Sequence, residues 1–423
     1  MSSIIFVPSS GFGIPFFRGI AAAGSNQLSI SNAPNPGTGP VLPISFLSDI
    51  NPFTSTTATN WTNNWKPYLD AVFSCNAVSN ITVTFSKITI TPTFVSGGWF
   101  LGAVHPNSNI YFAPYNATNG ILCLNPNTSV TSLVGVNSGI SYAGSAKWYT
   151  GCLGPDSNIY FFPWQTKTTI LKYIPSTDTA SEITITGTGG SYAGLGYRGA
   201  VLASDGRIYS PPYNATTVFW YNPVTNTSGN ITSDSSSAKR YEGAAIGANG
   251  NIYFSPLTAQ LPLLKLNLST NTTSVTIATG VSATNTYRGA ASLAANGNLY
   301  FPPNSTNTPV ICMTSNESVS LLSVTSGTGY RDSFLGPDGN IYVIPSGNPL
   351  NAIRVATSNN SISTLTNSAT PTTQFNSQGG NMGLDGNIYV NTSANNTILK
   401  IQFNNVKYRF DSNYILSPHV NRH

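Results

Sequence analysis

The chain has 423 residues and a formal net charge of +5, and only 7% of its residues are charged. Hydrophobic residues make up 40% of the chain, which excludes a disordered polypeptide, because disorder combines low hydrophobicity with high net charge. The 38 glycines, the 28 prolines and the abundant Ser, Thr and Asn disfavour helix bundles, coiled coils and α/β nucleotide-binding folds. The composition therefore predicts an all-β, loop-rich protein.

The same composition excludes several kinds of partner. Lysine and arginine form no cluster of the kind that binds nucleic acid, and no apolar run approaches the length of about 18 residues that spans a membrane. Four cysteines are too few and too scattered for a disulfide framework or a zinc site. We therefore expect no nucleic-acid partner, no membrane span, no metal site and no cofactor.

Residues 1–95 do not repeat any later part of the chain. Their beginning resembles a secretory signal peptide, but residues such as Pro8 and Gly11 interrupt the apolar stretch and no basic segment precedes it. We interpret 1–95 as an arm and anchor region, with a short amphipathic helix at 61–74 indicated by the spacing of its apolar residues. Two interpretations stay open: the region covers one end of the domain that follows, or it docks that domain on other subunits.

An Ile-Tyr or Leu-Tyr pair recurs seven times after residue 95, each time behind a turn signal. The tyrosines are Tyr111, Tyr160, Tyr209, Tyr253, Tyr300, Tyr342 and Tyr389, with spacings of 49, 49, 44, 47, 42 and 47 residues. Turn pairs such as Asp205-Gly206 and Asn249-Gly250 are typical of a two-residue type I′ hairpin, in which both central residues need positive φ. The pattern predicts seven β-hairpins.

Each hairpin belongs to a longer unit. A strand-like run precedes the turn, a third run such as ILKY (170–173) follows the hairpin, and a weaker fourth run such as SVTSL (129–133) comes next. Four short strands in about 46 residues are typical of a propeller blade. We predict a seven-bladed β-propeller over residues 96–410 and a tail over 411–423. Either residues 407–410 or the run at 81–94 supplies the last strand and closes the ring.

Two units show a resemblance most clearly: GAVLASDGRIYSPPYNATTVFWYNP (199–223) and GAVHPNSNIYFAPYNATNGILCLNP (102–126). They resemble the blade repeat of streptogramin-lyase-like propellers and the DGxIYxxP repeats of uncharacterised microbial and viral propellers. The resemblance covers about residues 97–403 and implies the fold. Enzymes of the lyase family use His and Glu near a metal on the axis. None of the three histidines, His105, His419 and His423, stands at the innermost position of a repeat, so we do not expect that activity.

Equivalent positions of the repeats form rings around the propeller axis. Ten residues before the Ile of each pair stand Phe100, Tyr149, Arg198, Glu242, Arg331 and Gln378, and Arg288 joins this set after a one-residue insertion. Because the first strand of a blade lies nearest the axis, we expect Arg198, Glu242, Arg288 and Arg331 to meet at the channel mouth. There they would bind a carboxylate, a phosphate or a sulfated sugar. The alternative is that they bridge neighbouring blades, with Glu242 as their ion-pair partner.

Two further columns follow from the same alignment. The third strands carry Cys123, Lys172, Trp220, Lys265, Cys312, Arg354 and Lys400, which we expect on a solvated face. Aromatic residues precede the hairpins at Trp99, Trp148, Tyr197, Tyr241, Tyr287 and Tyr330. We interpret this aromatic column as packing between blades, with carbohydrate stacking as the alternative.

Catalytic residues are not evident, because no histidine has an evident partner and the three glutamates, Glu182, Glu242 and Glu317, fall in different repeats. We therefore expect a non-enzymatic structural or adhesion protein at the surface of a virus particle. Residues 1–95 would contact other subunits, and the propeller would meet a host glycan or another anionic surface ligand. The alternatives are a secreted microbial propeller that binds or cleaves carbohydrate, and a streptogramin-lyase-like enzyme.

Overall fold

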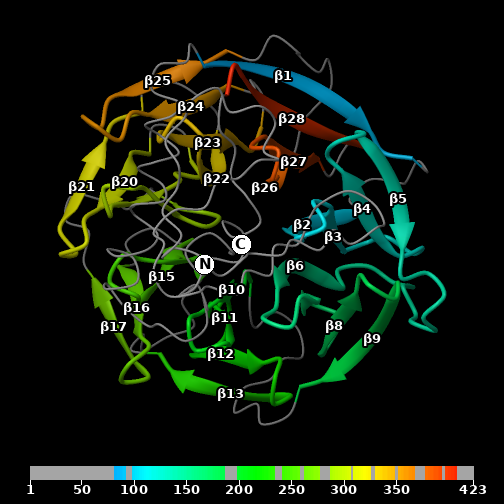
Figure 1. Ribbon diagram of the computed structural model, residues 1–423. Coiled ribbons are helices and arrows are strands. Elements are labelled where there is room, and N and C mark those ends of the chain that lie inside the picture. Colours follow the sequence, from blue (N-terminus) through cyan, green and yellow to red (C-terminus); the bar gives the residue numbers. More distant parts are fainter. Residues whose placement is uncertain are drawn as a thin grey trace, which may run out of the picture.

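The computed structural model describes residues 81–91, 98–185, 198–233, 241–257, 262–276, 286–305, 308–324, 329–347, 351–366, 377–392 and 396–406. These residues form 28 strands in seven four-stranded antiparallel sheets, arranged radially around one axis (Figure 1). The seven-bladed β-propeller predicted from the repeats is confirmed. The predicted helix at 61–74 and the tail at 411–423 lie outside the described residues.

The first four blades follow one another along the chain, each from its inner to its outer strand. The first contains β2 (Trp99–Val104), β3 (Ile110–Pro114), β4 (Ile121–Asn125) and β5 (Val130–Val134). The second contains β6 (Trp148–Leu153), β7 (Ile159–Pro163), β8 (Thr169–Ile174) and β9 (Thr179–Thr184). The third contains β10 (Val201–Leu202), β11 (Ile208–Ser210), β12 (Thr217–Asn222) and β13 (Thr227–Thr232). The fourth contains β14 (Tyr241–Ile246), β15 (Ile252–Pro256), β16 (Leu263–Asn267) and β17 (Thr272–Thr276).

The last three blades continue this order. The fifth contains β18 (Ser292–Leu293), β19 (Leu299–Phe301), β20 (Val310–Met313) and β21 (Val319–Leu322). The sixth contains β22 (Tyr330–Leu335), β23 (Ile341–Pro345), β24 (Ala352–Val355) and β25 (Ile362–Leu365). The seventh contains β26 (Ser377–Met382), β27 (Ile388–Thr392), β28 (Thr397–Asn404) and, as its outer strand, β1 (Thr82–Thr89). Every Ile-Tyr or Leu-Tyr pair thus opens the second strand of its blade, as predicted.

The ring is closed from the N-terminal side. Strand β1 pairs with β28 from Thr82 opposite Asn404 to Thr89 opposite Thr397, and the two strands lie side by side at the circumference (Figure 1). Just after β1, the Thr91 amide donates to Thr131 Oγ1 of the first blade (2.9 Å). Of the two predicted closures, the one through 81–94 is therefore observed. The boundary predicted between residues 95 and 96 is corrected accordingly, because β1 belongs to the propeller.

The hairpin turns differ from the predicted type I′ geometry. In the third blade the Ala203 amide donates to the Arg207 carbonyl (2.8 Å), so three residues separate the paired positions. Only the second residue of the Asp-Gly pair has a positive φ, 78° at Gly206. This is a type I turn followed by a left-handed residue. The Asp205 carboxylate accepts the Arg207 amide (3.0 Å), which explains why Asp or Asn occupies this position in every blade.

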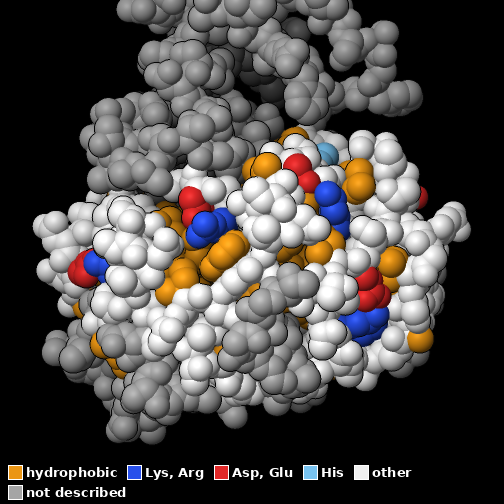
Figure 2. Space-filling model, turned by 90° about the horizontal axis from the view of Figure 1, so that it is seen from below, with side chains coloured by type: hydrophobic (Ala, Val, Ile, Leu, Met, Phe, Trp, Pro, Cys, Tyr) orange, Lys and Arg blue, Asp and Glu red, His pale blue; other side chains and the backbone are white. Residues whose placement is uncertain are grey.

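Each charged side chain of the third-strand column forms an ion pair with a carboxylate near a hairpin. In the second blade Asp156 Oδ2 accepts the Tyr160 hydroxyl (2.7 Å), and Lys172 Nζ of the third strand lies 3.2 Å from the same oxygen. Two of the three blades with a neutral turn residue also have a neutral third-strand residue: Asn107 with Cys123, and Asn296 with Cys312. On the face in view in Figure 2, blue and red side chains lie next to one another.

The fourth blade tests this rule, because Lys265 faces the neutral Asn249 there. Glu317 of the fifth blade supplies the missing carboxylate and pairs with both Lys265 and the Tyr253 hydroxyl. The third-strand column is therefore not the solvated face that we predicted. Cys123 and Cys312 are buried, and the charged members are half-buried against neighbouring side chains. The aromatic column is buried wherever it is described (Trp99, Trp148, Tyr241, Tyr287 and Tyr330), as expected of packing residues.

Candidate functional site

Irregular backbone at the start of two inner strands directs Glu242 and Arg331 toward the axis. The pairing of β14 with β15 shifts register between Tyr241 and Ala244, and Glu242 lies inside this bulge. The same shift between Tyr330 and Ser333 of β22 contains Arg331. A β-bulge bends its strand and turns a side chain out of the alternation of the sheet. The bulges thus turn Glu242 and Arg331 toward the channel.

In the third and fifth blades, glycines replace the bulge. Arg198 and Arg288 lie ahead of the short inner strands β10 and β18, and each is followed by a glycine in the left-handed region, Gly199 (φ 83°) and Gly289 (φ 73°). An L-residue is strained at such a φ. A Cβ on Gly289 would also overlap the Asp332 carboxylate. The two glycines therefore let the chain turn sharply beside the channel.

Three arginines converge on the buried carboxylate of Glu242. Arg198 Nη1 donates to Oε2 (2.9 Å), Arg288 Nε lies 3.2 Å from the same oxygen, and Arg331 Nη1 lies 3.8 Å from Oε1. Oε1 also accepts the hydroxyl of Tyr149 (2.8 Å), which in turn accepts a hydrogen bond from Arg331 Nη1 (3.1 Å). The four predicted site residues are thus brought together. We call them, with Tyr149, the arginine cluster.

The contacts of the arginine cluster cross the channel. Tyr149 belongs to the second blade, Glu242 to the fourth and Arg331 to the sixth, so no two of these blades are neighbours. Contacts among them are possible only across the axis of the ring. Both interpretations of the sequence therefore describe the cluster in part. The side chains face the channel, and Arg198 and Arg288 also bridge neighbouring blades, because each pairs with Glu242 from an adjacent blade.

Aromatic rings fix the guanidinium of Arg198. Its central carbon lies 4.1 Å from the ring centroid of Trp164, 4.3 Å from that of Tyr213 and 4.8 Å from that of Tyr149. A guanidinium above an aromatic face is stabilised by the ring quadrupole. Beside them, the ring of Tyr115 stacks on Phe100 with centroids 3.8 Å apart. One side of the channel mouth is therefore aromatic.

Electrostatics keep Glu242 ionised although it is buried. Burial alone would raise its pKa, but Arg198, Arg288 and Arg331 outweigh that effect and lower it from 4.5 to about 2. Burial and the Glu242 charge act together on Tyr149 and raise the pKa of its hydroxyl. At neutral pH the cluster thus holds three cations, one carboxylate and a neutral phenol, and keeps an excess of positive charge.

The arginines differ in their access to solvent. The exposed fraction of the side chain is 7% for Arg331, 13% for Arg198 and 26% for Arg288, against 4% for Glu242. Within the part of the chain that the structure describes, Arg288 makes one ion pair and no hydrogen bond, and Arg198 Nε has no hydrogen-bond partner. We call Arg198 and Arg288, the two more exposed arginines of the cluster, the outward pair; the Nε atoms of both are buried.

Sequence reasoning missed two members of this neighbourhood. Tyr149 stands at the same repeat position as the arginines, so its place in the ring was evident, but its hydrogen bond to Glu242 was not predicted. Asp332 follows Arg331, and its carboxylate accepts the amides of Ala290 (2.9 Å) and Gly380 (3.0 Å), joining three blades. It is the only charged residue at its repeat position, which is the signal that could have found it.

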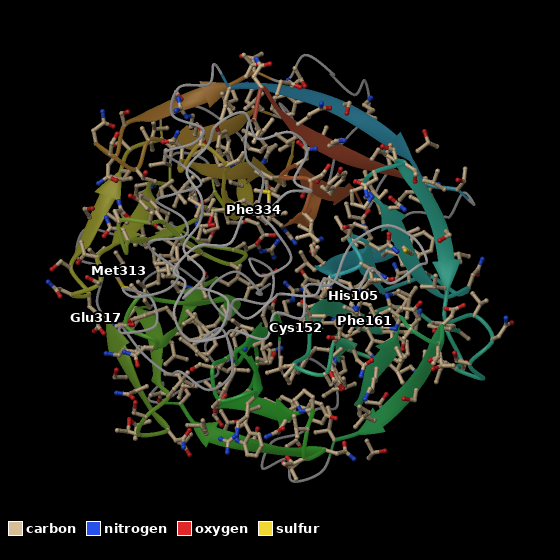
Figure 3. The ribbon with its side chains drawn as sticks, viewed as in Figure 1. His105, Cys152, Phe161, Met313, Glu317 and Phe334 are labelled. Carbon is tan, nitrogen blue, oxygen red and sulfur yellow. The ribbon has the colours of Figure 1, made fainter. Side chains whose placement is uncertain are left out.

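Other chemistry-bearing residues lie apart from the cluster. His105 at the first hairpin contacts the Ser157 carbonyl through Nε2 (3.0 Å), and its Nδ1 accepts the Asn107 amide (3.1 Å). Figure 3 places His105 and Glu317 on opposite sides of the ring. No three His, Cys, Asp or Glu side chains among the described residues are grouped so that they could hold a metal ion. None of the described elements is a helix long and apolar enough to cross a membrane.

The chain is a seven-bladed β-propeller whose channel mouth carries an arginine cluster. No family model matches it, and no curated protein sequence does. Among solved structures it is similar to a streptogramin B lyase (TM-score 0.62, 13% identity, 76% of this chain and 98% of that one). It is also similar to a catalytically inactive virginiamycin B lyase from Staphylococcus aureus with quinupristin (TM-score 0.60, 12% identity, covering 76% and 99%).

A third similar structure is the extracellular domain of a putative hybrid two-component system from B. thetaiotaomicron (TM-score 0.56, 11% identity). The match covers 76% of this chain and 42% of that one. At such identities the likeness shows the fold alone, and the similar proteins include both an enzyme and a sensor domain. The resemblance seen in the repeats is confirmed for the propeller, and function has to be argued from the site.

Proposed function

We propose that the protein is a non-enzymatic binding and adhesion protein that recognises an anionic ligand at the channel mouth. The observation that carries the proposal is the excess of positive charge on the outward pair, Arg198 and Arg288, beside the compensated Glu242. Elsewhere the described basic side chains near the hairpins face a carboxylate or an aromatic ring. The channel mouth is thus the place where an anion would bind with the most favourable electrostatic energy.

The finer part of the proposal concerns the setting of the protein. We place it at the surface of a virus particle, with residues 1–95 contacting other subunits. The low charged fraction of 7% and the aromatic residues of the N-terminal arm, such as Phe16, Phe17 and Trp61, support this, because exposed aromatic surface needs cover. Deleting residues 1–50 should leave the propeller folded but prevent its incorporation into particles. Mass spectrometry of purified particles is the measurement, and incorporation of the truncated protein would contradict the proposal.

Retention on surfaces coated with anionic or neutral polymers tests the binding function. The wild-type protein should be retained on the anionic surfaces alone, and less so at high salt, because exposed charges are screened. Arg288→Gln should weaken retention at least tenfold. Arg207→Gln is the matched control, because it removes the same charge from a hairpin where Arg207 stacks on Trp220 (4.2 Å). Equal loss in both variants would contradict a specific site, and a metal-dependent lyase activity of the pure protein would contradict the non-enzymatic assignment.

A further inference from the structure

The Glu242 carboxylate divides the arginine cluster into an inner and an outer half. Its Oε1 faces Tyr149 and Arg331, which are the more buried partners. Its Oε2 faces Arg198 and Arg288, whose side chains are 13% and 26% exposed. The cluster therefore already holds one carboxylate between guanidinium groups, and the outer two groups continue the same arrangement toward solvent.

The charge of the neighbourhood favours a monoanion. Three arginines contribute +3 and the carboxylates of Glu242 and Asp332 contribute −2, which leaves +1 for these five side chains. A carboxylate neutralises this charge, whereas a phosphate dianion would exceed it. The planar fork of a guanidinium also matches the two oxygens of a carboxylate. Arg288 has such donors available, because its Nη atoms make no hydrogen bond with any described residue.

An aromatic surface lies next to Arg198. Tyr115 directly follows β3 and is half-buried. One face of its ring stacks on Phe100 (3.8 Å), and it forms a T-shaped pair with Tyr149 (centroids 6.1 Å apart). Burial raises the pKa of Tyr115 while the charge of Arg198 opposes the rise, which shows that the phenol lies within electrostatic reach of that arginine. The C–H groups of a sugar ring carry a partial positive charge that packs well on an aromatic face.

We propose that Arg198, Arg288 and Tyr115 bind a sugar that carries a carboxylate, as uronic and sialic acids do. The carboxylate lies against the outward arginine pair, and the sugar ring lies on Tyr115. The inference rests on the proposed function, because it assigns a ligand class to the same anion site. A site of this kind differs from a general anion site, because its ligand needs both the carboxylate and the sugar ring.

Ligand-observed NMR and isothermal titration at low salt provide the test. The probes are methyl glucuronide, sialic acid, methyl glucoside, acetate, glucose 6-sulfate, glucose 6-phosphate and an acidic peptide. The proteins are the wild type, Arg288→Gln, Arg288→Lys, Tyr115→Leu and the control Arg207→Gln. We expect the two acidic sugars to bind best. Arg288→Gln should weaken the binding of both acidic sugars at least tenfold. Arg288→Lys should weaken it less, and Arg207→Gln should leave it unchanged. Tyr115→Leu should weaken the acidic sugars but not acetate.

The outcomes separate this inference from the proposed function. Sulfated or phosphorylated sugars that bind as tightly as the uronide would overturn the carboxylate assignment and leave the anion site intact. Acetate binding equal to that of methyl glucuronide would overturn the role of the sugar ring, and preference for the acidic peptide would assign the site to a protein ligand. Failure of every anion to bind a protein with a wild-type melting curve would overturn both proposals.

Discussion

Replacing Glu242 by Gln should destabilise the propeller more than any comparable change at a surface carboxylate. The variant keeps the side-chain volume but leaves Arg198, Arg288 and Arg331 without their shared counter-ion in a buried position. The pKa of Glu242 falls from 4.5 to about 2 on folding, a difference of about 2.5. At 1.36 kcal/mol for each pKa unit this corresponds to about 3 kcal/mol of stability. The loss expected when one partner of a buried ion pair is removed is also about 3–5 kcal/mol.

Urea denaturation at a series of pH values measures this contribution. Because the pKa is lower in the folded state, the stability from Glu242 is complete above about pH 4.5 and is lost as the pH falls toward 2. The difference between wild type and Glu242→Gln should therefore shrink over that pH range. Glu182→Gln is the control: Glu182 pairs with Lys167 (2.5 Å) but is 25% exposed, so it should cost less than about 1 kcal/mol. A Glu242→Gln protein as stable as the control variant at pH 7 would refute the reasoning.

Three further changes test other parts of the account. In thermal unfolding, Gly289→Ala should lower the free energy of unfolding by about 1–3 kcal/mol more than Gly206→Ala. Both glycines have positive φ, but only at Gly289 does a Cβ meet other atoms within 4 Å. Equal losses in the two variants would contradict this. In a double-mutant cycle, the stability loss of the Asp385→Asn/Lys400→Cys double variant should be about 0.5–1 kcal/mol smaller than the sum of the two single losses. Additive losses would refute the matching of charges between turn and third strand. Burial lowers the pKa of His105 below 6.5 despite its hydrogen bonds, so its contribution to stability is present above pH 6.5 and falls away at lower pH. His105→Gln should flatten the fall in melting temperature between about pH 6.5 and 5, and an unchanged profile would exclude His105 as its cause.

The blades were predictable because their signals are local and repeated. An Asp or Asn at the turn caps its own backbone two residues later, and the Ile-Tyr pair follows at once, so each hairpin is specified within about ten residues of sequence. Aligning seven such signals also placed Arg198, Glu242 and Arg331 on one ring, and the structure brings them together. The turn type was wrong because Asp-Gly suits both a type I′ turn and a type I turn followed by a left-handed residue.

Contacts between distant segments were harder to predict. The choice of β1 as the closing strand depends on pairing with β28 more than 300 residues away, and two segments had suitable patterns. The third-strand column was assigned to solvent because alternation identifies a face, not what packs on it. Residues of this column pair with turn residues such as Asp156. The sequence shows this pairing only when the charges of the two columns are compared across the blades.

Bromide-soaked crystals would test the central claim most directly, because the anomalous signal of bromide shows where excess positive charge gathers. The account predicts a peak at the channel mouth between Arg198 and Arg288, with Glu242 held beneath it, and the loss of that peak in the Arg288→Gln protein. Peaks elsewhere on the propeller with none at the arginine cluster would contradict an anion site there.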